Sequence, residues 1–129
     1  MTTNIHRFAS ELPFPFAKAV QAGDFLFLSG QVSMSAEGKP IYGSVAEQTE
    51  NIMQSIAKTL SDCGSDLDSV VKVTVWLSDM KHFAEFNQVY ATYFKQGFPA
   101  RSAISCDLVM GLDVEVEVQA VIKNNQYLA

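Results

Sequence analysis

The apolar side chains change their spacing in the middle of this 129-residue chain, and that change restricts the possible folds more than any other feature. Over residues 45–63 they recur every three or four positions, which is typical of an amphipathic helix. Over residues 70–77 they alternate with a period of two, which predicts a strand. The apolar face of that strand is predicted to consist of Val71, Val73, Val75 and Leu77.

Local signals mark the ends of two helices. Ser44 and Glu47 form an S-x-x-E pair, in which each side chain bonds the other residue's free backbone amide, and Gly64 is typical of the position after a helix end. The first helix is therefore expected over residues 45–63. Ser78 or Asp79 is expected to cap a second helix. Its predicted buried stripe consists of Phe83, Phe86, Tyr90, Tyr93 and Phe94.

Further strands are predicted on both sides of these helices. Residues 24–29 form a short apolar run, and residues 17–21 are expected to pair with it around a turn at Ala22-Gly23. The last two strands are expected over residues 101–108 and 114–122, the second of which alternates between apolar and polar side chains. The predicted order is strand, strand, helix, strand, helix, strand, strand.

These elements predict one α+β domain over residues 1–129. Each helix has a single apolar stripe, so both are expected on one face of a mostly antiparallel mixed sheet, which gives a two-layer fold. The strand at residues 25–28 is apolar on both sides, and Trp76 points away from the valine face of its own strand. We therefore expect another copy of the chain to cover part of the open face.

Composition excludes several classes of function. Nine basic and fourteen acidic residues give a net charge of −5, and the basic residues are scattered, so nucleic-acid binding is not expected. The sequence has no apolar run long enough for a bilayer and no signal peptide, so a soluble, cytoplasmic protein is expected. It has no glycine-rich phosphate loop or paired-cysteine motif, and His6 and His82 lack ligand-like spacing. Neither a metal nor an organic cofactor is expected.

Several polar residues are candidates for a binding site. Arg101 begins a strand directly after a helix exit, where a guanidinium can bind a carboxylate through two hydrogen bonds, although a surface salt bridge is the alternative. Glu115 and Glu117 lie on the polar face of the last strand, which is either a site or a solvated face. Asn87 lies beside an aromatic stripe, where its amide needs a structural partner or a ligand.

The segment Ser29-Gly30-Gln31 ends the apolar strand, and its glycine permits close approach by another group or simply forms a turn. Taken in order, this segment and four others form a combined signature: Gly23, Asn87, Pro99-Ala100-Arg101-Ser102 and Val116-Glu117-Val118-Gln119-Ala120. The combination resembles the Rid family, the reactive intermediate deaminases also called YjgF-like proteins. The resemblance implies a chorismate-mutase-like fold, a homotrimer around a central barrel, and clefts between subunits.

The resemblance also implies roles for individual residues. Arg101 would hold the carboxylate of a 2-imino or 2-oxo acid, and Glu117 would position water for attack on the imine carbon. Ser29, Gly30 and Asn87 match further positions of the cleft. The choice of Glu117 over Glu115 depends on aligning the last strand backward from its end, because the preceding loop is one residue longer than usual in the family.

Two departures leave alternatives open. Phe16 replaces a common tyrosine, and Ala103 replaces a common cysteine; both positions belong to the substrate-binding cleft that the resemblance implies. The leading hypothesis is a deaminase of reactive 2-imino acids. The second is a small-carboxylate sensor with weak or no hydrolysis, and the third, ribonuclease activity, is opposed by the acidic charge.

Overall fold

Helix α1 (Val45–Asp62) begins and ends where the local signals predicted. In the computed structural model, which describes residues 4–123, the Ser44 hydroxyl accepts a hydrogen bond from the Glu47 amide at 3.1 Å. The Glu47 carboxylate accepts one from the Ser44 amide at 3.0 Å, which completes the capping box. Gly64 follows the helix with a φ of 85°, a conformation that glycine adopts without steric cost.

The second helix differs from its prediction. The Asp79 carboxylate accepts a hydrogen bond from the Lys81 amide, but it caps a 3-10 turn, η2 (Met80–His82), and helix α2 (Phe83–Ala91) begins only after that turn. Tyr93 and Phe94 lie beyond the helix end, and Phe83 is exposed. The predicted burial is confirmed for Phe86, Tyr90 and Phe94, although Phe94 lies beyond the nine-residue helix; it was wrong for the exposed Phe83, and Tyr93 is only partly buried.

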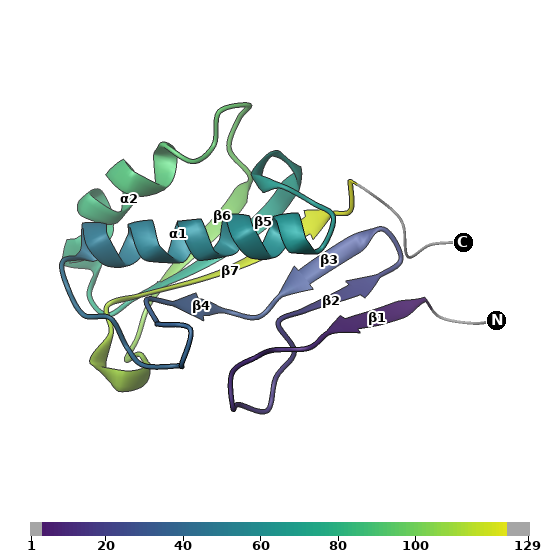
Figure 1. The fold of residues 1–129 in the computed structure, drawn as a ribbon. Helices are drawn as coiled ribbons and strands as arrows, with labels where there is room; N and C mark the ends of the chain where they lie inside the picture. Colours follow the sequence, from purple (N-terminus) through teal and green to yellow (C-terminus); the bar gives the residue numbers. More distant parts are fainter. Residues whose placement is uncertain (1–3, 124–129) are drawn as a thin grey trace.

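The strands of the described part form one sheet in the order β1-β2-β3-β7-β5-β6, with the short β4 also paired to β7 (Figure 1). Among the strand pairs of residues 4–123, β5 and β6 run parallel and the others are antiparallel. The strands are β1 (Ile5–Phe8), β2 (Ala19–Ala22), β3 (Phe25–Leu28), β4 (Gln31–Val32), β5 (Val70–Leu77), β6 (Ala100–Ser105) and β7 (Val114–Val121). The strands β1 and β4 were not predicted, and β6 ends three residues earlier than expected.

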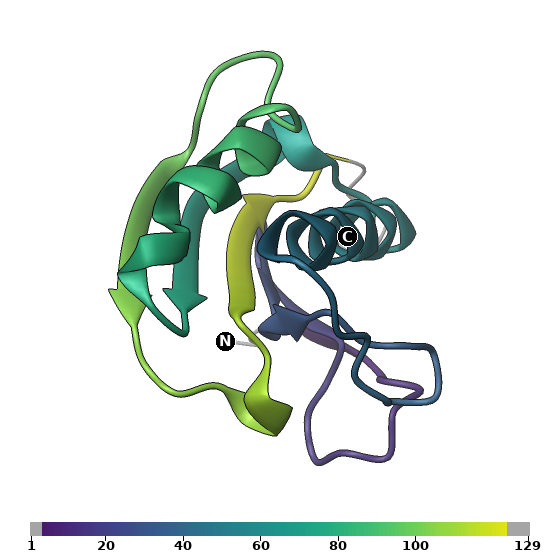
Figure 2. The ribbon, with the colours of Figure 1, turned by 90° about the vertical axis from the view of Figure 1, so that its left-hand side faces the viewer.

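Both helices lie on one face of this sheet, as predicted (Figures 1 and 2). The core between the layers contains Val73, Val75 and Leu77 of β5, all fully buried. Val71 was predicted to join them, but it is exposed and Val70 is buried instead. The cause is a break in the β5–β7 register between residues 70 and 72, since one inserted residue reverses the side-chain alternation.

The other face of the sheet is open and partly apolar. Leu26 and Leu28 of β3 are buried under the helices, whereas Phe25 and Phe27 of the same strand are exposed on the other side. Ile104 of β6 is also exposed. No helix within residues 4–123 is long and apolar enough to span a membrane.

Candidate active site

Arg101 lies on the helix-covered face of the sheet, at its edge. It pairs with the buried Val73 in the parallel register of β5 and β6, so both side chains point toward the helices. Its Nη1 donates a hydrogen bond to the Asn87 Oδ1 of α2 at 2.7 Å. Two of the predicted site residues, which are 14 positions apart in the sequence, are thus in direct contact.

Aromatic rings hold the Arg101 guanidinium on its other sides. Its central carbon lies 5.4 Å from the ring centre of Phe83, 6.0 Å from that of Phe86 and 5.0 Å from that of Tyr90. These distances are those of cation–π contacts. Within residues 4–123 no carboxylate forms an ion pair with Arg101, so the alternative of a surface salt bridge receives no support. The guanidinium is fixed in place and keeps donors for a ligand.

A cleft of about 340 Å³ opens beside this guanidinium. Its walls come from the end of α2, the following loop and the start of β6: Asn87, Tyr90, Ala91, Phe98, Pro99 and Arg101. Phe98 is 66% exposed although it is aromatic. Tyr90 is only 4% exposed, and its hydroxyl has no hydrogen-bond partner among the described residues. Burial raises the pKa of Tyr90 to about 12, against the opposing charge of Arg101, so its hydroxyl stays protonated.

The sequence did not single out Phe98 or Tyr90 as site residues. Tyr90 was expected in the buried stripe of α2, and it is buried there. The available signal was its hydroxyl, because a polar atom in an apolar stripe needs a partner. Phe98 could have been noted for its position three residues before Arg101, next to the helix exit.

The two candidate carboxylates lie on the opposite face of the sheet. Glu117 pairs with Thr74 and Glu115 with Trp76, and all four alternate with the buried residues of β5 and β7. Burial raises the pKa of the Glu115 carboxyl, and the negative charge of Glu117 raises it further. Close approach at Gly30 was correctly anticipated, since a Cβ added there would collide with the Glu115 carboxylate.

Ser29 directly follows β3, which pairs with the strand of these carboxylates, and Phe16 precedes β2. The Ser29 hydroxyl donates to the Ala17 carbonyl at 2.6 Å. The last pair of the β3–β7 register is Phe27 with Gln119. If this register continued for two more residues, Ser29 would lie opposite Glu117. Phe16 is exposed in the connection between β1 and β2 and stacks on Phe14, with ring centres 5.9 Å apart.

The candidate residues therefore form two half-sites within one chain. Arg101, Asn87 and the partly buried Ala103 lie on the helix side of β6 and α2. Glu117 and Ser29 belong to the β3–β7 side, and Glu117 points to the open face. A single copy of the chain does not bring Arg101 and Glu117 to the same side of the sheet.

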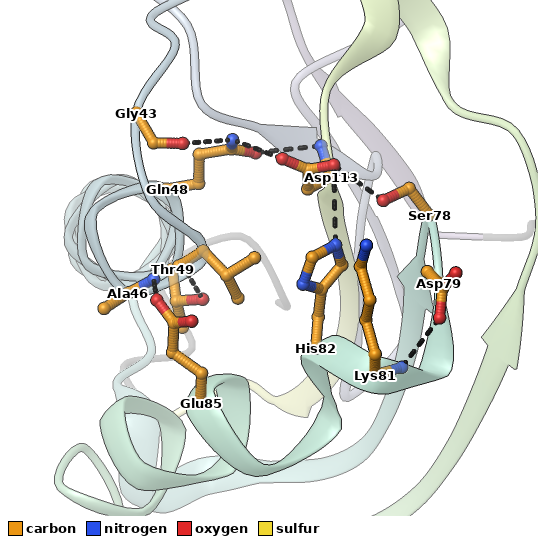
Figure 3. A network of polar contacts seen from close by, with 11 residues as sticks. Gly43, Ala46, Gln48, Thr49, Ser78, Asp79, Lys81, His82, Glu85 and Asp113 are labelled. Atoms are coloured by element: carbon orange, nitrogen blue, oxygen red, sulfur yellow. Dashed lines mark hydrogen bonds and ion pairs between the residues drawn. The ribbon is translucent and has the colours of Figure 1, made fainter.

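A second polar cluster surrounds Asp113, just before β7 (Figure 3). The Gln48 Nε2 donates to Asp113 Oδ2 at 3.2 Å, and the Asp113 amide donates to Gln48 Oε1 at 3.0 Å. The Ser78 hydroxyl donates to Asp113 Oδ1 at 2.6 Å, and His82 Nε2 lies 3.8 Å from the same oxygen. No group of metal-binding side chains occurs in the described part of the chain. This cluster ties α1, β5, η2 and β7 together.

Comparison with known proteins agrees with this geometry. Residues 6–123 match the family described as Endoribonuclease L-PSP. The crystal structure of a YjgF-family protein from Neisseria meningitidis superposes with a TM-score of 0.80 and 32% identity, covering 93% of this chain and 96% of that one. The chain belongs to the Rid family.

Relatives in this family carry several names. Protein MMF1, mitochondrial, from Saccharomyces cerevisiae is 43% identical over 110 residues, which are 84% of this chain and 76% of the relative. The crystal structure of yeast Mmf1 has a TM-score of 0.82 and covers 95% of this chain and 96% of its own. The 2-iminobutanoate/2-iminopropanoate deaminase of Mus musculus is 37% identical and covers 83% of this chain and 81% of its own. The mixed α+β fold is thus that of the Rid relatives.

Proposed function

We propose that this protein is a hydrolytic deaminase of reactive 2-imino and 2-enamino acids. The observation that carries the proposal is the Arg101 guanidinium. Asn87 and three aromatic rings hold it beside an open cleft, and no carboxylate within residues 4–123 pairs with it. Such a group suits the carboxylate of a small acid. The names of the mouse and human relatives, 2-iminobutanoate/2-iminopropanoate deaminase, support the same reaction.

In the proposed reaction, Arg101 binds the substrate carboxylate and orients the imine carbon. Glu117 accepts a hydrogen bond from a water molecule and positions its oxygen for attack on that carbon. A C–O bond forms while the π bond of C=N opens toward nitrogen, and one proton from water passes to that nitrogen. The C–N bond of the resulting amino alcohol then breaks and ammonia leaves, while the hydroxyl loses its proton and becomes the carbonyl of the 2-oxo acid. The 2-imino acid and water become a 2-oxo acid and ammonia. A protonated imine is already electrophilic, so these steps require no metal or organic cofactor.

The positions of the two half-sites support an active site shared between copies of the chain. Arg101 lies at the edge strand β6, whereas Glu117 lies on the open face. The exposed Phe25 and Phe27 on that face need cover, which a second copy would provide. We propose the homotrimer with a central barrel that the family resemblance implies. The cytoplasmic location stays a prediction, since one relative is named mitochondrial and another chloroplastic.

The first test measures how fast a 2-imino acid, released by an amino-acid dehydratase, disappears with and without the protein. Arg101→Ala is expected to lower kcat/KM by about 100-fold or more, because two charge-assisted hydrogen bonds are lost. Arg101→Lys is expected to lose nearly as much, since lysine cannot bind both carboxylate oxygens in the same plane. Arg7→Ala, which changes the chain's other arginine on an exposed edge strand, is the matched control and should keep the wild-type rate.

The same variants also test the shared site. Arg101→Ala and Glu117→Gln protomers are each expected to be inactive alone and to remain trimeric by light scattering. Mixed trimers contain boundaries where an intact Arg101 from one copy meets an intact Glu117 from another, so activity should return on mixing unfolded chains and refolding them together. Mixed trimers that stay inactive would contradict a shared site, and wild-type rates for Arg101→Ala would refute the anchor.

The sensor hypothesis keeps the same cleft but removes efficient hydrolysis, and Phe16 and Ala103 are its motivation. It predicts that the wild-type protein binds a 2-oxo acid without accelerating loss of the imine. RNA cleavage is a further candidate, because the matching family is described as an endoribonuclease. The net charge of −5 opposes it, and His82 faces Asp113 instead of an open cleft. RNA cleavage that survives in Arg101→Ala would favour this candidate.

A further inference from the structure

The cleft beside Arg101 is larger than recognition of a small carboxylate requires. Its volume is about 340 Å³. Binding pockets for drug-sized ligands measure roughly 300–1,000 Å³, so this cleft lies at the lower end of a range that holds far more than a three-carbon acid. Space remains once a carboxylate and the adjacent imine occupy the Arg101 end.

The surface around that space is apolar. The two polar side chains in the lining, Arg101 and Asn87, are bonded to each other. The remaining lining consists of Tyr90, Ala91, Phe98 and Pro99. The Tyr90 hydroxyl is buried, so this residue offers the cleft its ring. A ligand that fills the cleft therefore needs one charged end and one apolar end.

Resting on the proposed function, we infer that the preferred substrates are 2-imino acids with a bulky apolar side chain, branched aliphatic or aromatic. Arg101 binds the carboxylate, and the side chain of the substrate packs between Ala91 and Phe98. The single methyl group of Ala91 leaves room there, because any longer residue on the last turn of α2 would narrow the cleft. Phe98 is positioned for this contact, being 66% exposed and backed by Phe94 with ring centres 6.4 Å apart.

Charge complementarity favours a substrate over other occupants of this cleft. The apolar walls share one cavity with an arginine that has no ion pair within residues 4–123, so an apolar group alone leaves this charge without a partner there. An imino acid with a large side chain contacts the apolar walls and pairs its carboxylate with the arginine. A side chain from a neighbouring copy of the protein that fills the apolar end is the competing arrangement, and it predicts no preference for large substrates.

The experiment compares 2-iminopropanoate with the imines of leucine and phenylalanine, each generated by an amino-acid oxidase. For wild-type protein, kcat/KM is expected to be at least about tenfold higher for the larger imines, the discrimination typical of added methylene groups in an apolar pocket. Ala91→Phe fills the cleft and is expected to reduce that ratio at least about tenfold. Ala84→Phe, an exposed position two turns earlier on α2 and outside the cleft lining, is the control that should keep the ratio.

Binding of the matching 2-oxo acids, measured by calorimetry, separates this inference from the proposed function. If no imine is hydrolysed but 2-oxo-3-phenylpropanoate binds tighter than 2-oxopropanoate, and Ala91→Phe removes the difference, the deaminase proposal fails and the size preference stands. If all imines are hydrolysed with equal kcat/KM, or Ala91→Phe and Ala84→Phe give the same ratio, the size preference is overturned and the deaminase proposal stands.

Discussion

Two polar clusters lie along β5, one just beyond its last residue and one beside its middle, and they differ in how far the chain satisfies its own polar groups. Around Asp113, both carboxylate oxygens accept hydrogen bonds, from Ser78 and from Gln48, and the Asp113 amide is bonded as well. Around Arg101, one guanidinium nitrogen is bonded to Asn87. No carboxylate within residues 4–123 pairs with this arginine, and the neighbouring Tyr90 hydroxyl has no partner there.

The difference distinguishes a structural cluster from a binding site. A buried polar group that has its partners within the chain stabilises the fold, whereas one that lacks them lowers stability until a ligand or another chain supplies the partner. Each cluster joins a charged side chain to an amide side chain, Asp113 to Gln48 and Arg101 to Asn87, so the presence of such a pair does not separate them. The clusters are separated by the number of polar groups that have no hydrogen-bond partner. Substitutions in the two clusters are therefore expected to differ in their effects on stability and activity.

The largest expected difference lies in unfolding stability. Asp113→Ala removes the acceptor for Ser78 and Gln48 together, so we expect the free energy of unfolding to fall by about 2–4 kcal/mol. Arg101→Ala breaks one hydrogen bond and the contacts with three rings, but it also removes a partly desolvated charge that has no ion pair within residues 4–123, so the net cost should be about 1 kcal/mol. Urea unfolding of both variants at one fixed protein concentration measures the two values, because association also contributes to stability.

Activity should show the reverse order. Asp113→Ala is expected to retain deaminase activity per folded molecule at low temperature, whereas Arg101→Ala should be inactive while folded. If Arg101→Ala destabilises the chain as strongly as Asp113→Ala, the cluster around Arg101 is part of the structural framework. The distinction between the two regions would then be lost.

The sequence predicted those parts of the fold whose signals are local. Ser44, Glu47 and Gly64 define α1 through bonds within one turn of its ends, so its bounds were correct within one residue. Val71 was assigned to the wrong face because the irregularity after Val70 depends on the register with β7, which the alternation within one strand does not contain. The strand β1 was missed because its four residues are mostly exposed and show no apolar face.

The candidate site was predictable in its residue types but not in its arrangement. The contact between Arg101 and Asn87 joins two residues that the sequence had singled out separately. The assignment of Arg101 and Glu117 to opposite faces depends on the pairing of β5 with both β6 and β7. Such pairing is a long-range property of the sheet, which is why the division into two half-sites required coordinates.

A smaller effect concerns Tyr90. Tyr90→Phe removes a buried hydroxyl that has no partner within residues 4–123 and keeps the ring that packs on Phe86 and Phe94. We expect the free energy of unfolding to stay unchanged or to rise by up to about 1 kcal/mol, since an unsatisfied polar group no longer has to be desolvated. Tyr93→Phe is the matched control and should lower stability slightly, because the Tyr93 hydroxyl donates to Glu50 at 3.0 Å. Urea midpoints of the two variants test this opposite sign, and a loss of stability in Tyr90→Phe would show that its hydroxyl has a structural partner.

The smallest expected effect extends the comparison to the open face, where Glu115 is half-buried and has no hydrogen bond or ion pair within residues 4–123. Burial, and then the charge of Glu117, raises the pKa of Glu115 in the folded chain. Folding therefore favours the protonated form of Glu115. The stabilising contribution of this carboxyl is fully present below the ordinary pKa of a glutamate and is lost as the pH rises through the folded-state pKa.

The variant Glu115→Gln cannot ionise at this position and should be more stable relative to wild type at pH 7 than at pH 4. The difference in urea midpoint between the two proteins, measured across this range, should grow with pH and then level off, because no further protons are released. A difference that stays constant, or shrinks as the pH rises, would mean that a neighbouring copy of the chain gives Glu115 a positively charged or hydrogen-bonding partner. Glu115 would then resemble Asp113, whose carboxylate oxygens have partners, and not Arg101.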